Sequence, residues 1–186
     1  MADDAAIYLE TRDKPVVVLG HAFGNRLARA VATRHPDQVR GVILLAAGGL
    51  KPIAEKANTA LMQSFDPRLT PEEHREAVRY GFFAEGNAIP DYWLRGWHME
   101  TGRLQGAATG SVDSSLWWTA GGKPMLVISG LQDTIAPPAD TIDLLEAELG
   151  DQVTAVRIDG AGHALLPEVP DQLADEIEAW LADLAE

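Results

Sequence analysis

The chain has 186 residues and a formal net charge of −13 at pH 7, and 46% of its residues are hydrophobic and 23% charged. This length suffices for one domain with a sizeable core, and the composition is ordinary for a globular protein. The absence of cysteine excludes disulfides and zinc–cysteine sites. Residues 1–10 lack the pattern of a secretory signal and no apolar run reaches bilayer-spanning length, so we expect a cytoplasmic protein with no membrane partner.

The negative charge is concentrated in the last third of the chain. Residues 1–123 hold 14 acidic and 14 basic residues, whereas residues 124–186 hold 14 acidic residues and one base, Arg157. Nucleic-acid binding requires a basic surface, so no nucleic-acid partner is expected. We interpret the acidic third as the solvated face of two C-terminal helices.

The first quarter of the chain alternates between helix and strand patterns. Residues 2–11 are predicted to form a short helix. Val16–Leu19 is an uninterrupted apolar run, typical of a strand buried on both faces of a parallel sheet, and residues 39–47 (VRGVILLAA) are predicted to form a second buried strand. Between them, residues 25–35 have a helical pattern that ends before Pro36.

Residues 50–122 differ from the rest of the chain, with many prolines and glycines and no strand pattern. Thr70 and Glu73 have the spacing of a capping box, which predicts a helix from there to about residue 80. Two further helical segments are expected, over residues 91–100 and 111–119. The whole region is therefore predicted to be a helical insertion between two strands.

The alternation of strands and helices resumes after residue 123. Strands are predicted over residues 124–129 and 153–158, and helices over residues 138–149 and 170–184. This alternation favours an α/β fold with a parallel sheet. We predict about four strands flanked by helices, with a core of residues 1–49 and 123–186 and a helical cap of residues 50–122.

Three loops follow predicted strands directly, where sites form in open α/β sheets. The first is Gly20–Gly24, with the sequence GHAFG. The second is residues 130–138, GLQDTIAPP, and the third is residues 160–163, GAGH.

In this order, the loops resemble the nucleophile elbow, the acid loop and the histidine loop of the α/β-hydrolase fold family. The segment after the histidine resembles the last helix of the esterase, lactonase and haloalkane-dehalogenase-like branch. Members carry a triad in the chain order nucleophile, acid, histidine, and the matching positions are Ala22, Asp133 and His163. The resemblance implies a small-molecule substrate and no cofactor, and it places the insertion where these proteins carry a cap.

The physical chemistry of these positions agrees with the resemblance. Gly20 and Gly24 would relieve crowding in a sharp strand-to-helix turn, and the N–H of Phe23 would stabilise an oxyanion at a helix N-terminus. Asp133 would hold the Nδ1–H of His163 and leave Nε2 free as a base. Taken singly, each residue also has a structural alternative: close packing for the glycines, a turn cap for Asp133 and a loop histidine for His163.

Weaker candidates lie around these loops. His21 is beside the elbow and could line the pocket. An apolar substrate pocket could include Trp93, Trp97, His98 and Trp117, although packing of the cap on the sheet is the commoner role of such residues. No histidine and carboxylate pair has the spacing of a metal site.

Two features depart from the family pattern. Ala22 has no nucleophilic atom, and loss of a triad nucleophile lowers rates by of order 10⁶ in related systems. The elbow also appears at residue 22, whereas the family places it after the fifth strand, so we expect an N-terminally truncated member. The strand Val16–Leu19 would then be an exposed sheet edge open to self-association.

Two functions therefore stay open. In the first, Asp133 and His163 act as a general base that hydrolyses a small, largely apolar ester, lactone or similar substrate. In the second, the protein is a catalytically inactive member that binds a small ligand or a partner chain.

Overall fold

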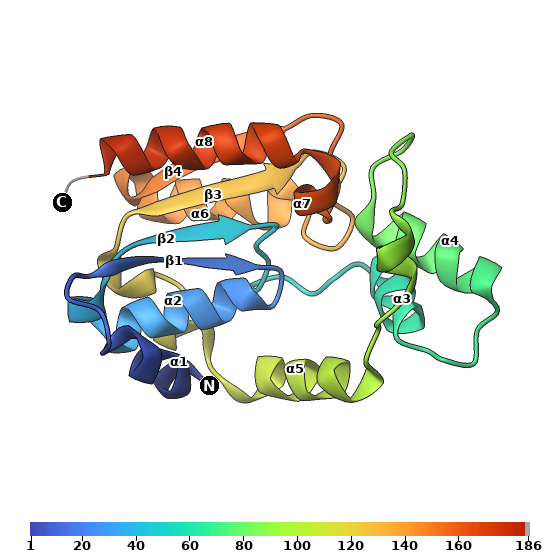
Figure 1. Ribbon diagram of the computed structural model, residues 1–186, viewed down its shortest axis with the longest axis horizontal. Helices are drawn as coiled ribbons and strands as arrows, with labels where there is room; N and C mark the ends of the chain where they lie inside the picture. The colour runs from blue at the N-terminus through green and yellow to red at the C-terminus, as the bar shows by residue number, and fades with distance from the viewer. Residues whose placement is uncertain (185–186) are drawn as a thin grey trace.

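The computed structural model describes residues 1–184, and its centre is a four-stranded parallel sheet (Figure 1). The strands are β1 Val16–His21, β2 Val39–Leu45, β3 Met125–Gly130 and β4 Val153–Ile158, and they lie side by side in chain order. Each neighbouring pair is parallel, so all four carboxyl ends lie at one edge of the sheet. The predicted α/β fold, with about four parallel strands flanked by helices, is confirmed.

Helices of two kinds connect and cover these strands. The α-helices are α1 Ala2–Leu9, α2 Gly24–Arg34, α3 Glu55–Ser64, α4 Pro71–Phe82, α5 Met99–Ser111, α6 Ile142–Leu149, α7 Leu165–Glu168 and α8 Pro170–Asp183. Short 3₁₀ turns are η1 Pro36–Gln38, η2 Asp91–Leu94, η3 Ser114–Leu116, η4 Ala120–Gly122, η5 Pro138–Asp140 and η6 Gly150–Gln152. No helix within residues 1–184 has both the length and the apolar character that crossing a bilayer requires.

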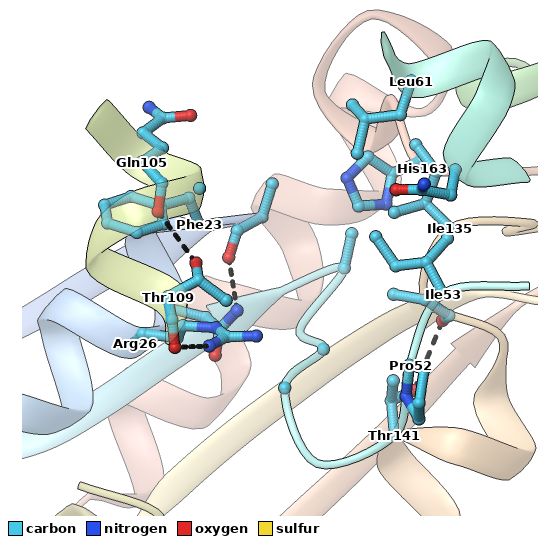
Figure 2. Close-up of a pocket in the computed structure, with 18 of the residues that line it drawn as sticks. Phe23, Arg26, Pro52, Ile53, Leu61, Gln105, Thr109, Ile135, Thr141 and His163 are labelled. Atoms are coloured by element: carbon cyan, nitrogen blue, oxygen red, sulfur yellow. Dashed lines mark hydrogen bonds between the residues drawn. The ribbon is translucent and has the colours of Figure 1, made fainter. Parts of the chain in front are cut away.

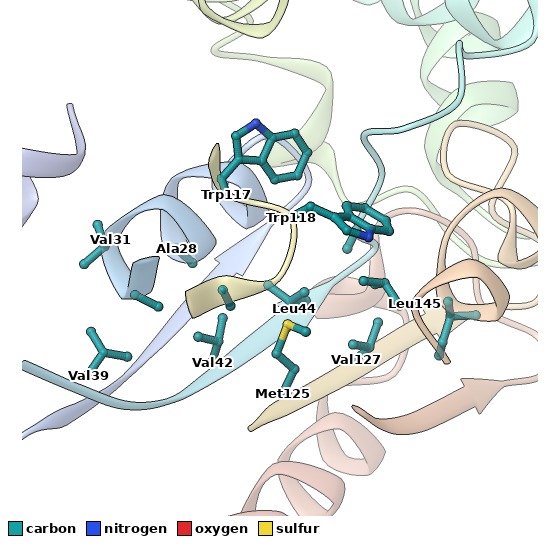
Figure 3. Packing of buried hydrophobic residues seen from close by; sticks show 14 residues of the cluster. Ala28, Val31, Val39, Val42, Leu44, Trp117, Trp118, Met125, Val127 and Leu145 are labelled. Atoms are coloured by element: carbon teal, nitrogen blue, oxygen red, sulfur yellow. The ribbon is translucent and has the colours of Figure 1, made fainter. Parts of the chain in front are cut away.

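Hydrophobic clusters cover both faces of the sheet. Alternate residues of β2 and β3 pack with α2 and α6 on one face, and the intervening residues pack with α7 and α8 on the other. Figure 3 shows the first cluster, in which Trp117 and Trp118 lie over the sheet beside α2. Burial on both faces explains why β2 and β3 are mostly apolar, with Arg40 and Ser129 as their polar residues.

Strand β1 is an edge of the sheet in the part of the chain that the structure describes. It pairs with β2 alone, and the side chain of Leu19 is 50% exposed. On the side of β1 away from β2, the backbone N–H and C=O groups of this apolar strand therefore pair with no other strand of the described residues.

The segment between β2 and β3 is helical, as predicted, but not all of its helices span the predicted residues. Helix α4 begins at Pro71 with the expected capping box, in which Thr70 and Glu73 bond each other's backbone N–H. The predicted helix over residues 91–100 is wrong, because Gly96 has a φ of +82° between η2 and α5. Helix α5 instead begins at Met99, and α3 was not predicted.

These helices lie close to the edge of the sheet formed by the carboxyl ends of the strands. In Figure 1, α3 and α4 pack together beyond the tips of the strand arrows. Helix α5 returns towards α2, where the guanidinium of Arg26 contacts the carbonyl of Thr109. The loops that follow the strands therefore face helices from residues 50–122.

Candidate active site

The loop after β1 is a sharp strand-to-helix turn centred on Ala22. Ala22 has a φ of +50°, in the left-handed region. Its N–H donates to the carbonyl of Leu45 at 3.0 Å, and its own carbonyl accepts from the N–H of Asn25 at 3.1 Å. A left-handed conformation costs a residue with a side chain roughly 1–2 kcal/mol. Hydrogen bonds to both sides of the residue hold it there.

The two glycines of this turn have different roles. A Cβ on Gly20 would lie 2.2 Å from the carbonyl oxygen of Gly24, so only glycine fits where β1 and α2 approach. A Cβ on Gly24 would meet no atom within 4 Å. The expected crowding is therefore present at Gly20, and the expectation for Gly24 is wrong because that position faces open space.

The acid and histidine loops bring Asp133 and His163 together. Both side chains are buried, and Nδ1 of His163 donates to Oδ2 of Asp133 at 2.8 Å. The other carboxylate oxygen of Asp133 accepts from the N–H groups of Ile135 at 2.9 Å and Ala136 at 2.8 Å. With Nδ1 carrying the proton, Nε2 is the basic nitrogen, and it has no hydrogen-bond partner among residues 1–184. Asp133 thus fixes the tautomer that a general base needs.

Glu168 holds the histidine loop against the helical segment. Its carboxylate accepts from the N–H of Gly162 at 2.8 Å, from the N–H of Ala84 at 2.7 Å and from the side-chain amide of Asn87 at 2.8 Å. One carboxylate therefore ties the residue before His163 to the loop after α4. Sequence analysis missed Glu168, because no local signal marks a residue that bonds a loop more than 70 positions away.

His21 packs against His163 instead of lining the cavity. Its Nε2 donates to the carbonyl of His163 at 2.8 Å, and the two ring centroids are 5.3 Å apart. Burial, and then the nearby charge of His163, lower the pKa of His21. We infer that a neutral His21 positions the backbone of the histidine loop.

A cavity of about 350 Å³ opens between the loops and the helical segment. Its lining includes Ala22, Phe23, Arg26, Ala46, Leu61, Met62, Phe65, Trp97, Gln105, Thr109, Ile135 and His163. Figure 2 shows Leu61, Ile135 and His163 gathered at one end and Arg26 with Thr109 at the other. The N–H of Phe23 has no backbone acceptor among the described residues, so it is available to a bound group.

Of the four residues predicted to form an apolar pocket, Trp97 lines the cavity. Trp93 lies outside that lining and packs edge-on against Phe83 and Trp97. His98 is exposed at the start of α5, and Trp117 is buried in the core cluster beside α2. The aromatic pocket predicted from these residues is therefore reduced to Trp97. Within residues 1–184, no three histidine or acidic side chains converge to hold a metal ion.

Comparison with known proteins gives one family and many structures of similar fold. The family profile described as "Alpha/beta hydrolase family" matches residues 1–176. No curated protein matches the chain.

Three solved structures illustrate the likeness in fold. Rv0554 from Mycobacterium tuberculosis is 20% identical with a TM-score of 0.72, and the match covers 100% of this chain and 72% of that one. A pyrethroid hydrolase from Sphingobium faniae is 20% identical with a TM-score of 0.66, covering 96% and 75%. An esterase from Exiguobacterium antarcticum is 12% identical with a TM-score of 0.75, covering 98% and 72%.

Proposed function

This chain belongs to the alpha/beta hydrolase family, and we propose that it hydrolyses a small, largely apolar ester, lactone or similar substrate. The observation that carries the proposal is the buried 2.8 Å hydrogen bond from His163 to Asp133, beside a cavity that His163 lines. An esterase and a pyrethroid hydrolase share the fold, which supports an ester as the substrate class.

The proposed reaction uses water as the nucleophile, because the methyl group of Ala22 can neither attack nor lose a proton. His163 Nε2 takes a proton from a water molecule while the water oxygen bonds to the carbonyl carbon. The resulting oxyanion accepts a hydrogen bond from the N–H of Phe23. Collapse breaks the bond to the leaving oxygen, and His163 returns the proton to it. Asp133 stabilises the imidazolium and keeps its orientation throughout.

The helical segment of residues 50–122 has the proposed role of a cap over this reaction. Leu61 and Met62 from α3, Trp97, and Thr109 from α5 all line the cavity. Such a cap would exclude bulk water and bind the apolar part of the substrate.

The first test is turnover of a panel of 4-nitrophenyl esters and small lactones by the wild type and His163→Ala. We expect His163→Ala to lower kcat/KM by roughly 10²–10⁴, the contribution of general-base catalysis. His35→Gln is the matched control, because His35 lies at the far end of α2 and bonds Asp3. Equal turnover by the wild type and His163→Ala would refute the proposal.

A second test separates water attack from a covalent route. Intact-mass spectrometry during turnover should show no acyl adduct on the wild type. Ala22→Ser places a hydroxyl in the cavity that His163 also lines, so we expect an acyl adduct on that variant. An adduct on the wild-type chain would identify a different nucleophile and contradict the mechanism.

Ala22 itself favours a second function, in which the cavity binds a small ligand without turnover. Saturable ligand binding by a protein that hydrolyses none of the panel would support this alternative.

A partner role would use the exposed edge of β1, through which we propose self-association of Val16–Leu19. Light scattering on the wild type should then show dimers that Leu19→Lys dissociates, since a charge on an edge strand blocks pairing. A monomeric wild type would exclude this partner role.

A further inference from the structure

The end of the cavity away from His163 contains the guanidinium of Arg26, whose central carbon lies 5.3 Å from the centre of the Trp117 ring. Its hydrogen bond, from Nη1 to the carbonyl of Thr109, is 3.5 Å long and therefore weak. Among residues 1–184, Arg26 forms no ion pair with a carboxylate. A guanidinium has five N–H donors in a planar fork, so most of the donors of Arg26 are available to a group in the cavity.

A second guanidinium lies behind this end of the cavity. Arg29 is 0% exposed, and it donates to the carbonyl of Gly48 at 3.1 Å and to the side chain of Asn25. Its Nε and Nη1 have no partner within the described residues. The rings of Trp117 and Trp118 lie 4.5 and 4.6 Å from its central carbon, which supplies cation–π stabilisation.

Within residues 1–184, no carboxylate forms an ion pair with Arg26 or Arg29. Burial, and then the charge of Arg26, lower the pKa of Arg29 to about 9, so Arg29 remains protonated at neutral pH. Lys51 adds a further cation to the cavity lining, and Asp140 is the acidic residue of that lining, with no ion pair to either arginine in the described part of the chain. Two neighbouring cations without a counter-ion raise the local potential, and an anion placed there would lower their energy.

We propose that Arg26 binds a carboxylate of the substrate, which makes the substrate a half-ester of a dicarboxylic acid or a lactone that bears a free carboxylate. The planar fork of an arginine matches the two oxygens of a carboxylate in a bidentate pair. The methylene chain between the two ends of such a substrate suits the apolar lining that includes Leu61 and Ile135. A carboxylate held at Arg26 would orient the ester group towards His163 at the opposite end (Figure 2). The ester half of this inference rests on the proposed function, whereas the anion site rests on the two arginines alone.

Calorimetry with two matched probes tests the anion site without turnover. Monomethyl glutarate carries a carboxylate and dimethyl glutarate is its neutral counterpart, and His163→Ala is used so that neither is hydrolysed. We expect the half-ester to bind roughly tenfold or more tightly, the value of a charge-assisted hydrogen bond. In the His163→Ala protein, a second substitution Arg26→Gln should abolish the preference for the half-ester over the diester. Arg26→Lys should keep part of that preference. Arg34→Gln removes the same charge from an exposed position of α2 and should leave the preference intact.

Three results would overturn the inference: equal affinity for both probes, no measurable binding of the half-ester, or a preference that survives Arg26→Gln. Turnover of the same two esters by the active chain separates this inference from the proposed function. Arg26-dependent binding without hydrolysis of either ester would refute the proposed function and leave the anion site standing. His163-dependent hydrolysis with no preference for the half-ester would refute only the anion site.

Discussion

The close approach of β1 and α2 makes Gly20→Ala the sharpest test of the elbow. The new Cβ would lie 2.2 Å from the carbonyl oxygen of Gly24, 2.4 Å from its carbonyl carbon and 2.7 Å from the N of Asn25. Real Cβ contacts stay beyond 3.0 Å, so the strand and helix must separate by most of an ångström. All three obstructing atoms belong to the backbone and cannot rotate away. We expect a loss of about 3 kcal/mol in the free energy of unfolding, the upper end of the usual cost of overpacking.

Urea denaturation followed by tryptophan fluorescence measures this loss. With a slope of about 2 kcal/mol per molar, 3 kcal/mol lowers the midpoint by about 1.5 M. Gly24→Ala is the matched control in the same turn, because its Cβ meets no atom within 4 Å and the φ of Gly24 is not positive. We expect that variant to be neutral or up to ~1 kcal/mol more stable, since alanine restricts the unfolded chain. The reasoning fails if Gly20→Ala stays within about 0.5 kcal/mol of the wild type.

Three further predictions concern the same loops. Asp133→Asn should lower kcat/KM by about 10³ or more, because an amide that donates to Nδ1 of His163 moves the imidazole proton to Nε2; ester turnover checks this, and a loss below tenfold would contradict it. Ala22→Gly should stabilise the fold by about 0.5 kcal/mol in urea titrations, because relief of the left-handed φ outweighs the added entropy of the unfolded chain; a clear destabilisation would show that the alanine is unstrained. The lowered pKa of His21 means that the unfolded chain binds a proton near pH 6.5 before the folded protein does, so its contribution to stability falls as the pH drops below that value. His21→Gln should therefore flatten the stability profile between pH 7 and pH 5, and an unchanged slope would argue against a buried neutral His21.

The sheet and the pairing of Asp133 with His163 were predictable because their signals are local. Runs rich in apolar β-forming residues identified all four strands, and burial on both faces leaves few polar positions in the central strands, Arg40 in β2 and Ser129 in β3. The capping box at Thr70 fixed the start of α4, because its two hydrogen bonds involve residues three positions apart. The pairing of Asp133 with His163 followed from the order of the loops in the family resemblance, since the carboxyl ends of parallel strands meet at one edge.

The cavity was not predictable in the same way, because its lining depends on helices that return from residues 50–122. The helical pattern of residues 25–35 does not show that Arg26 lines a cavity, because it does so only where α5 returns and the carbonyl of Thr109 contacts its guanidinium. Helix α5 itself lacked a signal, since it contains three glycines and buries no residue completely. The prediction that Trp117 lines the pocket was wrong because its ring packs over Arg29 in the core cluster and lies outside the cavity lining.

The elbow keeps its shape without help from the side chain at position 22. The N–H and carbonyl of Ala22 are bonded to Leu45 and Asn25, and Gly20 allows α2 to begin directly above β1. None of these interactions involves the Cβ of Ala22. Replacement by serine therefore adds one hydroxyl to a fixed backbone, and any acyl adduct on Ala22→Ser reports on that hydroxyl alone. Under the proposed mechanism, the wild-type chain and Ala22→Ser therefore share the N–H of Phe23 and the Asp133–His163 pair, and they should differ in the attacking atom.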